Sequence, residues 1–182
     1  MIVGEVTIRL AEAADLPAIG ELVQRAYRGE SARAGWTHEA DLLDGQRIDL
    51  AQLAEMLGNP GQAILAAESR RKIIGCVHIA DGDGGVASLG MLAVDPLLQA
   101  NGLGRRLINA AEVEAARRFG SDRIEMTVIK ARPDLIAYYG RRGYLPTGEE
   151  RPFPLDDPRF GLPRSRDLAF VVLNKSIEAA ST

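Results

Sequence analysis

The sequence is poor in cysteine. It contains one cysteine in 182 residues, and that residue, Cys76, lies inside the apolar run Ile73 to Val77. A single cysteine excludes an internal disulfide framework. Its apolar surroundings favour a small core residue over a nucleophile.

Long hydrophobic runs are also missing. No apolar stretch reaches the roughly 18 residues that a membrane-spanning helix needs. The opening residues, Met1 to Glu5, do not place a basic segment ahead of an apolar one, as a signal peptide would. We therefore expect a cytoplasmic protein with no membrane partner.

An excess of positive charge is the third absence. Lysine and arginine number 22 against 25 aspartates and glutamates, which gives a formal net charge of -3. Dedicated nucleic-acid binders usually carry a basic face. The charge balance therefore argues against a nucleic-acid partner.

The hydrophobic pattern predicts one domain over residues 1–182. Apolar runs predict strands at 6–10, 63–67, 73–79, 86–94, 123–129, 144–148 and 168–173, and helical spacing predicts helices at 15–27, 49–58, 104–119 and 134–142. An early hairpin and a late strand–helix–strand crossover predict an α/β fold with a mixed sheet and helices on both faces.

One loop organises the chain. A strand ending at Val94 is followed by Pro96, a polar turn, and then Gly102 and Gly104 at the start of a helix. A helix N-terminus presents unpaired N–H groups and a partial positive charge, which suit a pyrophosphate. Glycines let a ligand approach the backbone, and Arg105 adds charge. The alternative is that the glycines only let the helix pack closely against the sheet.

Two common nucleotide motifs are excluded. The pair Gly102 and Gly104 lacks a third glycine and a following acidic residue at a strand end, so the dinucleotide fingerprint fails. No Walker A sequence, with its Lys-Ser or Lys-Thr pair after the glycines, occurs in the chain. The remaining pattern is Gln99-x-x-Gly102-x-Gly104.

A second motif follows one strand later, Ala137-Tyr-Tyr-Gly-Arg-Arg-Gly-Tyr144. The two motifs together resemble those of the GNAT superfamily of acyl-CoA-dependent N-acetyltransferases, namely its Q/R-x-x-G-x-G/A loop and its aromatic-Tyr-x-x-x-Gly-aromatic segment. The resemblance implies a GNAT-type mixed, mostly antiparallel sheet of about seven strands with helices on both faces. It also implies an N-acetyltransferase that uses acetyl-CoA and no metal.

The resemblance implies roles for particular residues. Tyr139 would lie near the thioester sulfur and protonate the leaving thiolate as a general acid. The strand end at 92–94 would pair with the pantetheine arm, and backbone amides of 99–105 would hold the pyrophosphate. The family often has an asparagine seven residues before the tyrosine, where this chain has an arginine. The cofactor-binding residues are then Leu92, Ala93, Val94, Gln99, Ala100, Asn101, Gly102, Leu103, Gly104, Arg105 and Arg132.

The general base is left open. An amine attacks a thioester carbonyl only when it is deprotonated, so a proton acceptor is needed, directly or through water. The strand before Val94 lacks the glutamate that some relatives place there. His78 on the neighbouring strand is one candidate, Glu39 and Asp41 are others, and a water chain is a third. The oxyanion would be met by a strand amide, that of Leu92.

Two irregular segments are candidates for the acceptor site. Trp36 shares a loop with Glu39, and together they offer an aromatic face and a negative charge to a cationic amine. Trp36 alternatively anchors its loop over the core. The segment 151–166 is too long for a hairpin turn, so we expect it to fold over the site as a lid.

These observations predict an enzyme that transfers an acetyl group from acetyl-CoA to the primary amine of a small molecule in a ternary complex. Two alternatives stay open: a CoA-binding sensor or partner module without turnover, and an acyltransferase that acts on protein or tRNA. The final hairpin of the sheet offers an edge through which a homodimer would form.

Overall fold

The main sheet of the computed structural model has seven strands, and the structure describes residues 5–178. Residues 1–4, used above to argue against a signal peptide, and 179–182 lie outside the described part. In spatial order the strands are β1 (Thr7–Leu10), β3 (Gln62–Ser69), β4 (Lys72–Asp81), β5 (Val86–Val94), β6 (Arg123–Ile129), β9 (Ala169–Ser176) and β7 (Leu145–Pro152). Among the described strands of this sheet only β5 and β6 pair in parallel, so the predicted fold class is confirmed.

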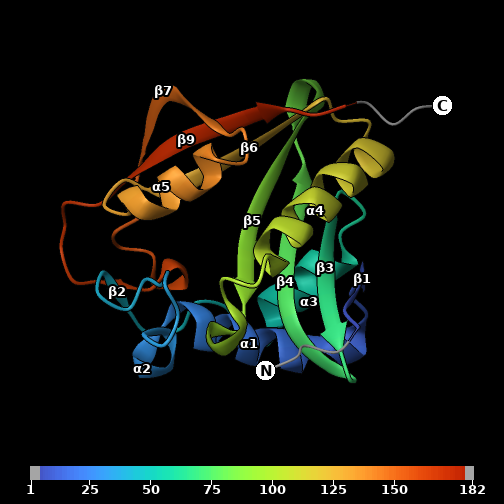
Figure 1. Ribbon diagram of the computed structural model, residues 1–182. Helices are drawn as coiled ribbons and strands as arrows, with labels where there is room; N and C mark the ends of the chain where they lie inside the picture. The colour runs from blue at the N-terminus through green and yellow to red at the C-terminus, as the bar shows by residue number, and fades with distance from the viewer. Residues whose placement is uncertain (1–4, 179–182) are drawn as a thin grey trace.

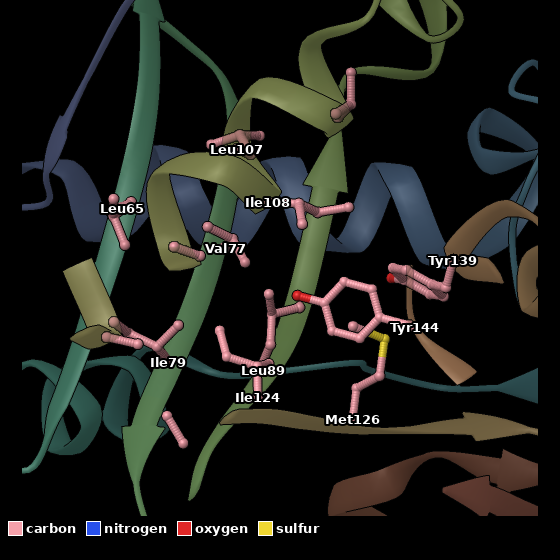
Figure 2. Close-up of a cluster of buried hydrophobic side chains, with 14 of the residues drawn as sticks. Leu65, Val77, Ile79, Leu89, Leu107, Ile108, Ile124, Met126, Tyr139 and Tyr144 are labelled. Carbon is pink, nitrogen blue, oxygen red and sulfur yellow. The ribbon is translucent and has the colours of Figure 1, made fainter. Parts of the chain in front are cut away.

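Helices cover both faces of this sheet (Figure 1). α1 (Leu16–Tyr27) and α3 (Leu50–Gly58) lie behind it in this view, and α4 (Leu103–Phe119) and α5 (Pro133–Gly140) lie in front. Each pair of helices buries its apolar stripe against one face, which divides the core into two clusters. Figure 2 shows the α4 side, where Leu107, Ile108, Tyr139 and Tyr144 meet side chains from the strands.

Local signals account for the helix ends. Asp49 accepts a hydrogen bond from the Gln52 amide at 2.8 Å, and the Gln52 side chain accepts one from the Asp49 amide at 3.0 Å, so a capping box starts α3. Gly120, with φ of +67°, ends α4 in the left-handed conformation that glycine adopts most readily. Both helices lie within a residue of the predicted bounds.

A second, two-stranded sheet joins segments that are far apart in the chain. β2 (Leu43–Asp44) pairs antiparallel with β8 (Leu162–Pro163). β2 follows the short helix α2 (Gly29–Ala32), in a stretch whose sequence shows no clear period. Phe153 and Leu168 pack with Leu43 in a third apolar cluster. This pairing fixes the loop between α1 and α3 against the segment that precedes β9.

The sheet opens between its two parallel strands. β5 and β6 pair at only three positions, from Val86 opposite Arg123 to Ser88 opposite Glu125, and then diverge (Figure 1). Beyond Ser88 the β6-facing edge of β5 has no strand partner among residues 5–178. The pairing of β5 with β4 is also interrupted, at a bulge that includes Met91 with φ of +50°.

No helix within residues 5–178 combines the length and the apolar character needed to span a bilayer.

Core packing on α4 is testable with two substitutions in one helix. Leu107 is fully buried, whereas Val113 is 67% exposed. Leu107→Ala should lower the free energy of unfolding by about 2–5 kcal/mol, because it removes buried methyl groups and leaves a cavity. Val113→Ala should change it by less than about 0.5 kcal/mol. Urea denaturation measures both, and equal effects would contradict this account of the core.

Candidate active site

A cleft of about 320 Å³ lies where β5 and β6 diverge. The end of β5 and the loop after it form one side, α5 forms the other, and the end of α1 with residues 36–37 closes one end. Of the predicted cofactor-binding residues, all line this cleft except Asn101. The predicted Tyr139 and Trp36 line it as well.

The loop after β5 delivers the start of α4 to the cleft. Ala100 and Gly102 adopt positive φ values of +69° and +76°, and α4 begins at Leu103. Amides in the first turn of α4 have no intrahelical partner. A Cβ added at Gly104 would lie 2.5 Å from the hydroxyl oxygen of Tyr138, so a side chain there would require Tyr138 to move.

Gln99 has a structural role that its motif did not reveal. Its side-chain oxygen accepts a hydrogen bond from the backbone amide of Trp36 at 2.9 Å, and its side-chain nitrogen donates to the carbonyl of Val94 at 3.3 Å. Gln99 therefore holds the Trp36 loop against the end of β5. The chain separation of 63 residues explains why sequence reasoning missed the contact.

Aromatic side chains form one wall of the cleft. The ring of Tyr138, on α5, lies 5.0 Å from the ring of Trp36, centroid to centroid. The guanidinium carbon of Arg142 lies 3.4 Å from the centroid of the Tyr138 ring. Trp36 stays 44% exposed. It therefore contributes an open aromatic face to the cleft and anchors its loop on α5 at the same time, so neither interpretation of Trp36 excludes the other.

Tyr139 belongs to both the core and the cleft. Its side chain is buried, and its ring lies 6.1 Å from that of Tyr144, edge to face (Figure 2). Burial raises the pKa of the Tyr139 hydroxyl well above its ordinary value. The hydroxyl is therefore protonated at neutral pH, which is the state that a proton donor requires.

Tyr27 is a cleft residue that the sequence analysis did not select. Its hydroxyl donates a hydrogen bond to the carbonyl of Leu92 at 2.6 Å, and burial raises its pKa to about 12. This bond ties the end of α1 to β5 beside the bulge at Met91. A tyrosine at the end of an otherwise aliphatic helix stripe was the available signal.

Glu39 does not reach the cleft, contrary to the expectation that it would meet a cationic amine. Its side chain is buried, and its carboxylate accepts hydrogen bonds from Arg28 at 2.9 Å and from Arg132 at 3.3 Å. Arg47 approaches the same carboxylate at 3.9 Å. A charge in the protein interior is costly unless it is paired, and the carboxylate of Glu39 is paired with these arginines rather than facing the cleft.

The other candidate bases also lie elsewhere. His78 does not line the cleft, because its side chain lies beside Gln62 on β3, with the ring nitrogen Nε2 2.7 Å from the amide oxygen Oε1. Burial lowers the pKa of His78 to about 4. Asp41 is exposed and pairs with Arg33 at 2.5 Å. With His78, Glu39 and Asp41 held in these contacts, water is the remaining candidate for the proton acceptor.

The segment 151–166 does not cover the cleft, so the lid prediction is wrong. Its residues are absent from the cleft lining and form β8 against β2 instead. Its arginines also have partners: Arg164 binds Asp44 at 2.7 Å, and Arg159 binds Asp157 at 2.6 Å. The segment braces the loop between α1 and α3 from outside.

The cleft is electrostatically positive. Its lining within residues 5–178 includes Arg105, Arg132 and Arg142 and no aspartate or glutamate. Nor does the described part of the chain hold any group of three or more His, Cys, Asp or Glu side chains suited to a metal ion. The arrangement favours an extended anionic ligand.

Known proteins resemble this chain both in sequence family and in fold. A model of the acetyltransferase (GNAT) family matches residues 17–144. No curated protein sequence matches the chain. Several solved structures share its fold along nearly the whole length of both chains.

Three of these structures illustrate the range. The ribosomal-protein-S18-alanine N-acetyltransferase of Escherichia coli has a TM-score of 0.70 at 20% identity, over 97% of each chain. YncA of Salmonella typhimurium, solved with its cofactor acetyl-CoA, has a TM-score of 0.69 at 22% identity, over 97% of this chain and 96% of that one. A spermidine N-acetyltransferase chimera from Vibrio cholerae and hSSAT has a TM-score of 0.66 at 16% identity, over 95% and 96%.

The burial of His78 predicts a pH effect on stability. Its pKa is about 4 in the folded protein and 6.5 when unperturbed, so the unfolded chain binds an extra proton between these values. The free energy of unfolding should therefore fall by about 1–2 kcal/mol from pH 7 to pH 5, above the usual range of carboxylates. His78→Gln should remove this part of the slope. Equal slopes in the two proteins, measured by urea denaturation, would contradict the burial argument.

Proposed function

Since this chain belongs to the GNAT family of acetyltransferases, whose model matches more than half of it, we propose that it transfers an acetyl group from acetyl-CoA to the primary amine of a small molecule. Both substrates would be bound at once, in the cleft between the end of β5 and α5. The observation that carries the proposal is the continuity of an unpaired strand edge with a glycine-rich helix start.

The cofactor end of the cleft is suited to two chemical parts of CoA, the pantetheine arm and the pyrophosphate. The amide-bearing pantetheine arm can pair with β5 at Leu92–Val94, along the edge that no described strand occupies, in the manner of an added strand. The pyrophosphate can accept hydrogen bonds from the amides at the start of α4, between Gly102 and Arg105. Arg105, which is exposed on α4, adds a charge that the phosphates can approach.

The reaction needs little covalent chemistry from the protein. The neutral amine attacks the thioester carbonyl carbon, the carbon–sulfur bond breaks, and the sulfur takes the hydroxyl proton of Tyr139. The proton released from the amine nitrogen returns to Tyr139 through water. Holding two bound substrates together supplies much of the rate enhancement, on the order of 7–11 kcal/mol at best.

The cleft favours a neutral amine without a strong base. Its described lining holds no carboxylate or histidine but three arginines. Positive neighbours lower the pKa of a bound ammonium group, because they disfavour its charged form. A larger fraction of the amine is then neutral, and water suffices as the proton acceptor.

The bulge in β5 supplies a place for the developing oxyanion. The ladder between β5 and β4 is interrupted at Met91, whose φ is positive, and the Tyr27 hydroxyl donates to the carbonyl of Leu92. We assign the amide of Leu92 to the oxyanion, since a fixed donor stabilises charge that develops there.

A protein N-terminus is the second candidate acceptor. One observation favours it, namely that a structure of the same fold is named a ribosomal-protein-S18-alanine N-acetyltransferase. A peptide and a free small amine can be compared directly as acceptors, with free thiol release as the readout.

Acetyl-CoA binding can be followed with Trp36, the one tryptophan of the chain, which lines the cleft. Acetyl-CoA should change its fluorescence with saturation. Gly104→Val should weaken binding by at least about tenfold, because the new side chain occupies the loop beside Tyr138. Gly58→Ala, where nothing lies within 4 Å, is the control and should keep wild-type affinity. An unchanged dissociation constant for Gly104→Val would contradict the cofactor assignment.

The role of Tyr139 can be separated from packing with two hydroxyl deletions. Tyr139→Phe should lower kcat by roughly 100-fold with little change in acetyl-CoA affinity, since general acid catalysis is lost. Tyr144→Phe is the matched control, because its hydroxyl bonds Glu112 at 2.8 Å and does not line the cleft. Similar kcat values for Tyr139→Phe and the wild type would mean that Tyr139 has only a packing role in the core.

A further inference from the structure

Three arginines surround one buried carboxylate beside the cleft. Glu39 accepts hydrogen bonds from Arg28 at 2.9 Å and Arg132 at 3.3 Å, and lies 3.9 Å from Arg47. The side chains of Arg28, Glu39 and Arg132 are 2%, 9% and 10% exposed. Three positive groups thus share one negative group in surroundings where unpaired charge is costly.

Only one of these arginines faces the cleft. Arg28 is enclosed, with hydrogen bonds to the carbonyls of Asp44 at 3.4 Å and Phe160 at 3.3 Å. Arg47 lies over the ring of Tyr27, 5.1 Å from its centroid. Arg132 lines the cleft beside Thr37, whose hydroxyl accepts one of its hydrogen bonds at 2.5 Å.

Arg132 retains the capacity to bind a further ligand. A guanidinium group has five N–H donors in a fixed fork, and the contacts with Glu39 and Thr37 occupy two of them. The fork matches a carboxylate, which can accept two parallel hydrogen bonds. A carboxylate there would also offset the excess positive charge of the cluster.

The position of Arg132 separates this site from the phosphate loop. Arg132 precedes α5, and Tyr138, whose hydroxyl lies against Gly104, is six residues further along. Six helical residues span about 9 Å. Arg132 instead contacts Thr37, in the loop between α1 and α3.

We propose that the acceptor carries a carboxylate close to its amine, as an amino acid does, and that Arg132 binds this carboxylate. The assignment rests on the proposed acetyl transfer and names the acceptor class for it. It replaces the expectation that Arg132 contacts the pantetheine arm, which is neutral and offers no charge to pair. It also disfavours polyamines, since no acidic side chain in the described lining would pair with their charges.

The location suits the reaction as well. Tyr139 lines the cleft with Arg132, and the arginine charge partly offsets the effect of burial on the pKa of the tyrosine hydroxyl. The two groups therefore lie within electrostatic reach of each other. A carboxylate held by Arg132 brings the amine of the same small molecule to the part of the cleft where Tyr139 lies.

Matched acceptors test the proposal with the wild-type protein. The twenty standard L-amino acids, their C-terminal amides, spermidine and putrescine would be compared at saturating acetyl-CoA by free thiol release. For the acceptor that turns over best, the acid should exceed its amide in kcat/KM by at least about tenfold, since a charge-assisted bond is lost. An amide or polyamine acetylated as fast as any acid would overturn the carboxylate assignment.

Substitution of Arg132 provides the second test. Arg132→Gln should lower kcat/KM for the acid by at least about tenfold and change the amide little, so that the preference disappears. Arg132→Lys keeps the positive charge but loses the forked donors, so its kcat/KM for the acid should lie between those of the wild type and Arg132→Gln. Arg117→Gln, on an exposed part of α4, is the charge-loss control and should keep the preference. A preference that persists in a folded Arg132→Gln protein would overturn the assignment.

Failure of the proposed function has a different signature. No thiol release with any acceptor, while acetyl-CoA still binds, would count against acetyl transfer to small amines. The same amino acids would then be titrated into the acetyl-CoA complex and followed by Trp36 fluorescence. A saturable response that Arg132→Gln removes would support the carboxylate site, and no response from any acid would overturn it.

Discussion

The separation of β5 from β6 is the constraint on which the rest of this structure depends. Backbone N–H and C=O groups in a protein interior need partners, yet the β6-facing edge of β5 lacks a strand beyond Ser88. The surrounding elements keep this opening rather than closing it. α5 and α4 pack along its front, a bulge that includes Met91 interrupts the pairing of β5 with β4, and the Tyr27 hydroxyl donates to the carbonyl of Leu92.

The ion cluster around Glu39 shapes the proposed acceptor end of the cleft, as the glycine loop shapes the proposed cofactor end. It joins the end of α1, the loop after it and the start of α5, and Arg28 extends the contact to the carbonyl of Phe160. Breaking such a buried pair by removing one partner typically costs about 3–5 kcal/mol. The cluster therefore holds the acceptor end in shape while it leaves positive charge at Arg132.

The two ends of the cleft differ in how far the sequence predicts them. The glycine loop, Tyr139 and the strand before the loop lie within 89–144, and local rules of helix starts, glycine conformation and strand pattern identify them. The acceptor end is assembled from contacts across large sequence distances, such as Arg132 with Thr37 at a separation of 95 residues and Arg28 with Phe160 at 132. No local pattern marks such contacts in advance.

Element order, the mixed sheet and the phosphate loop followed from local sequence, because hydrophobic periodicity, capping residues and glycine placement act over a few neighbouring residues. Three other features were decided by tertiary packing. Glu39 and His78 turned away from the cleft into buried contacts, and the 151–166 segment paired with β2 instead of covering the site. The physical reason is shared: a charged or polar side chain takes the partner that the folded chain brings to it, and that partner is distant in sequence.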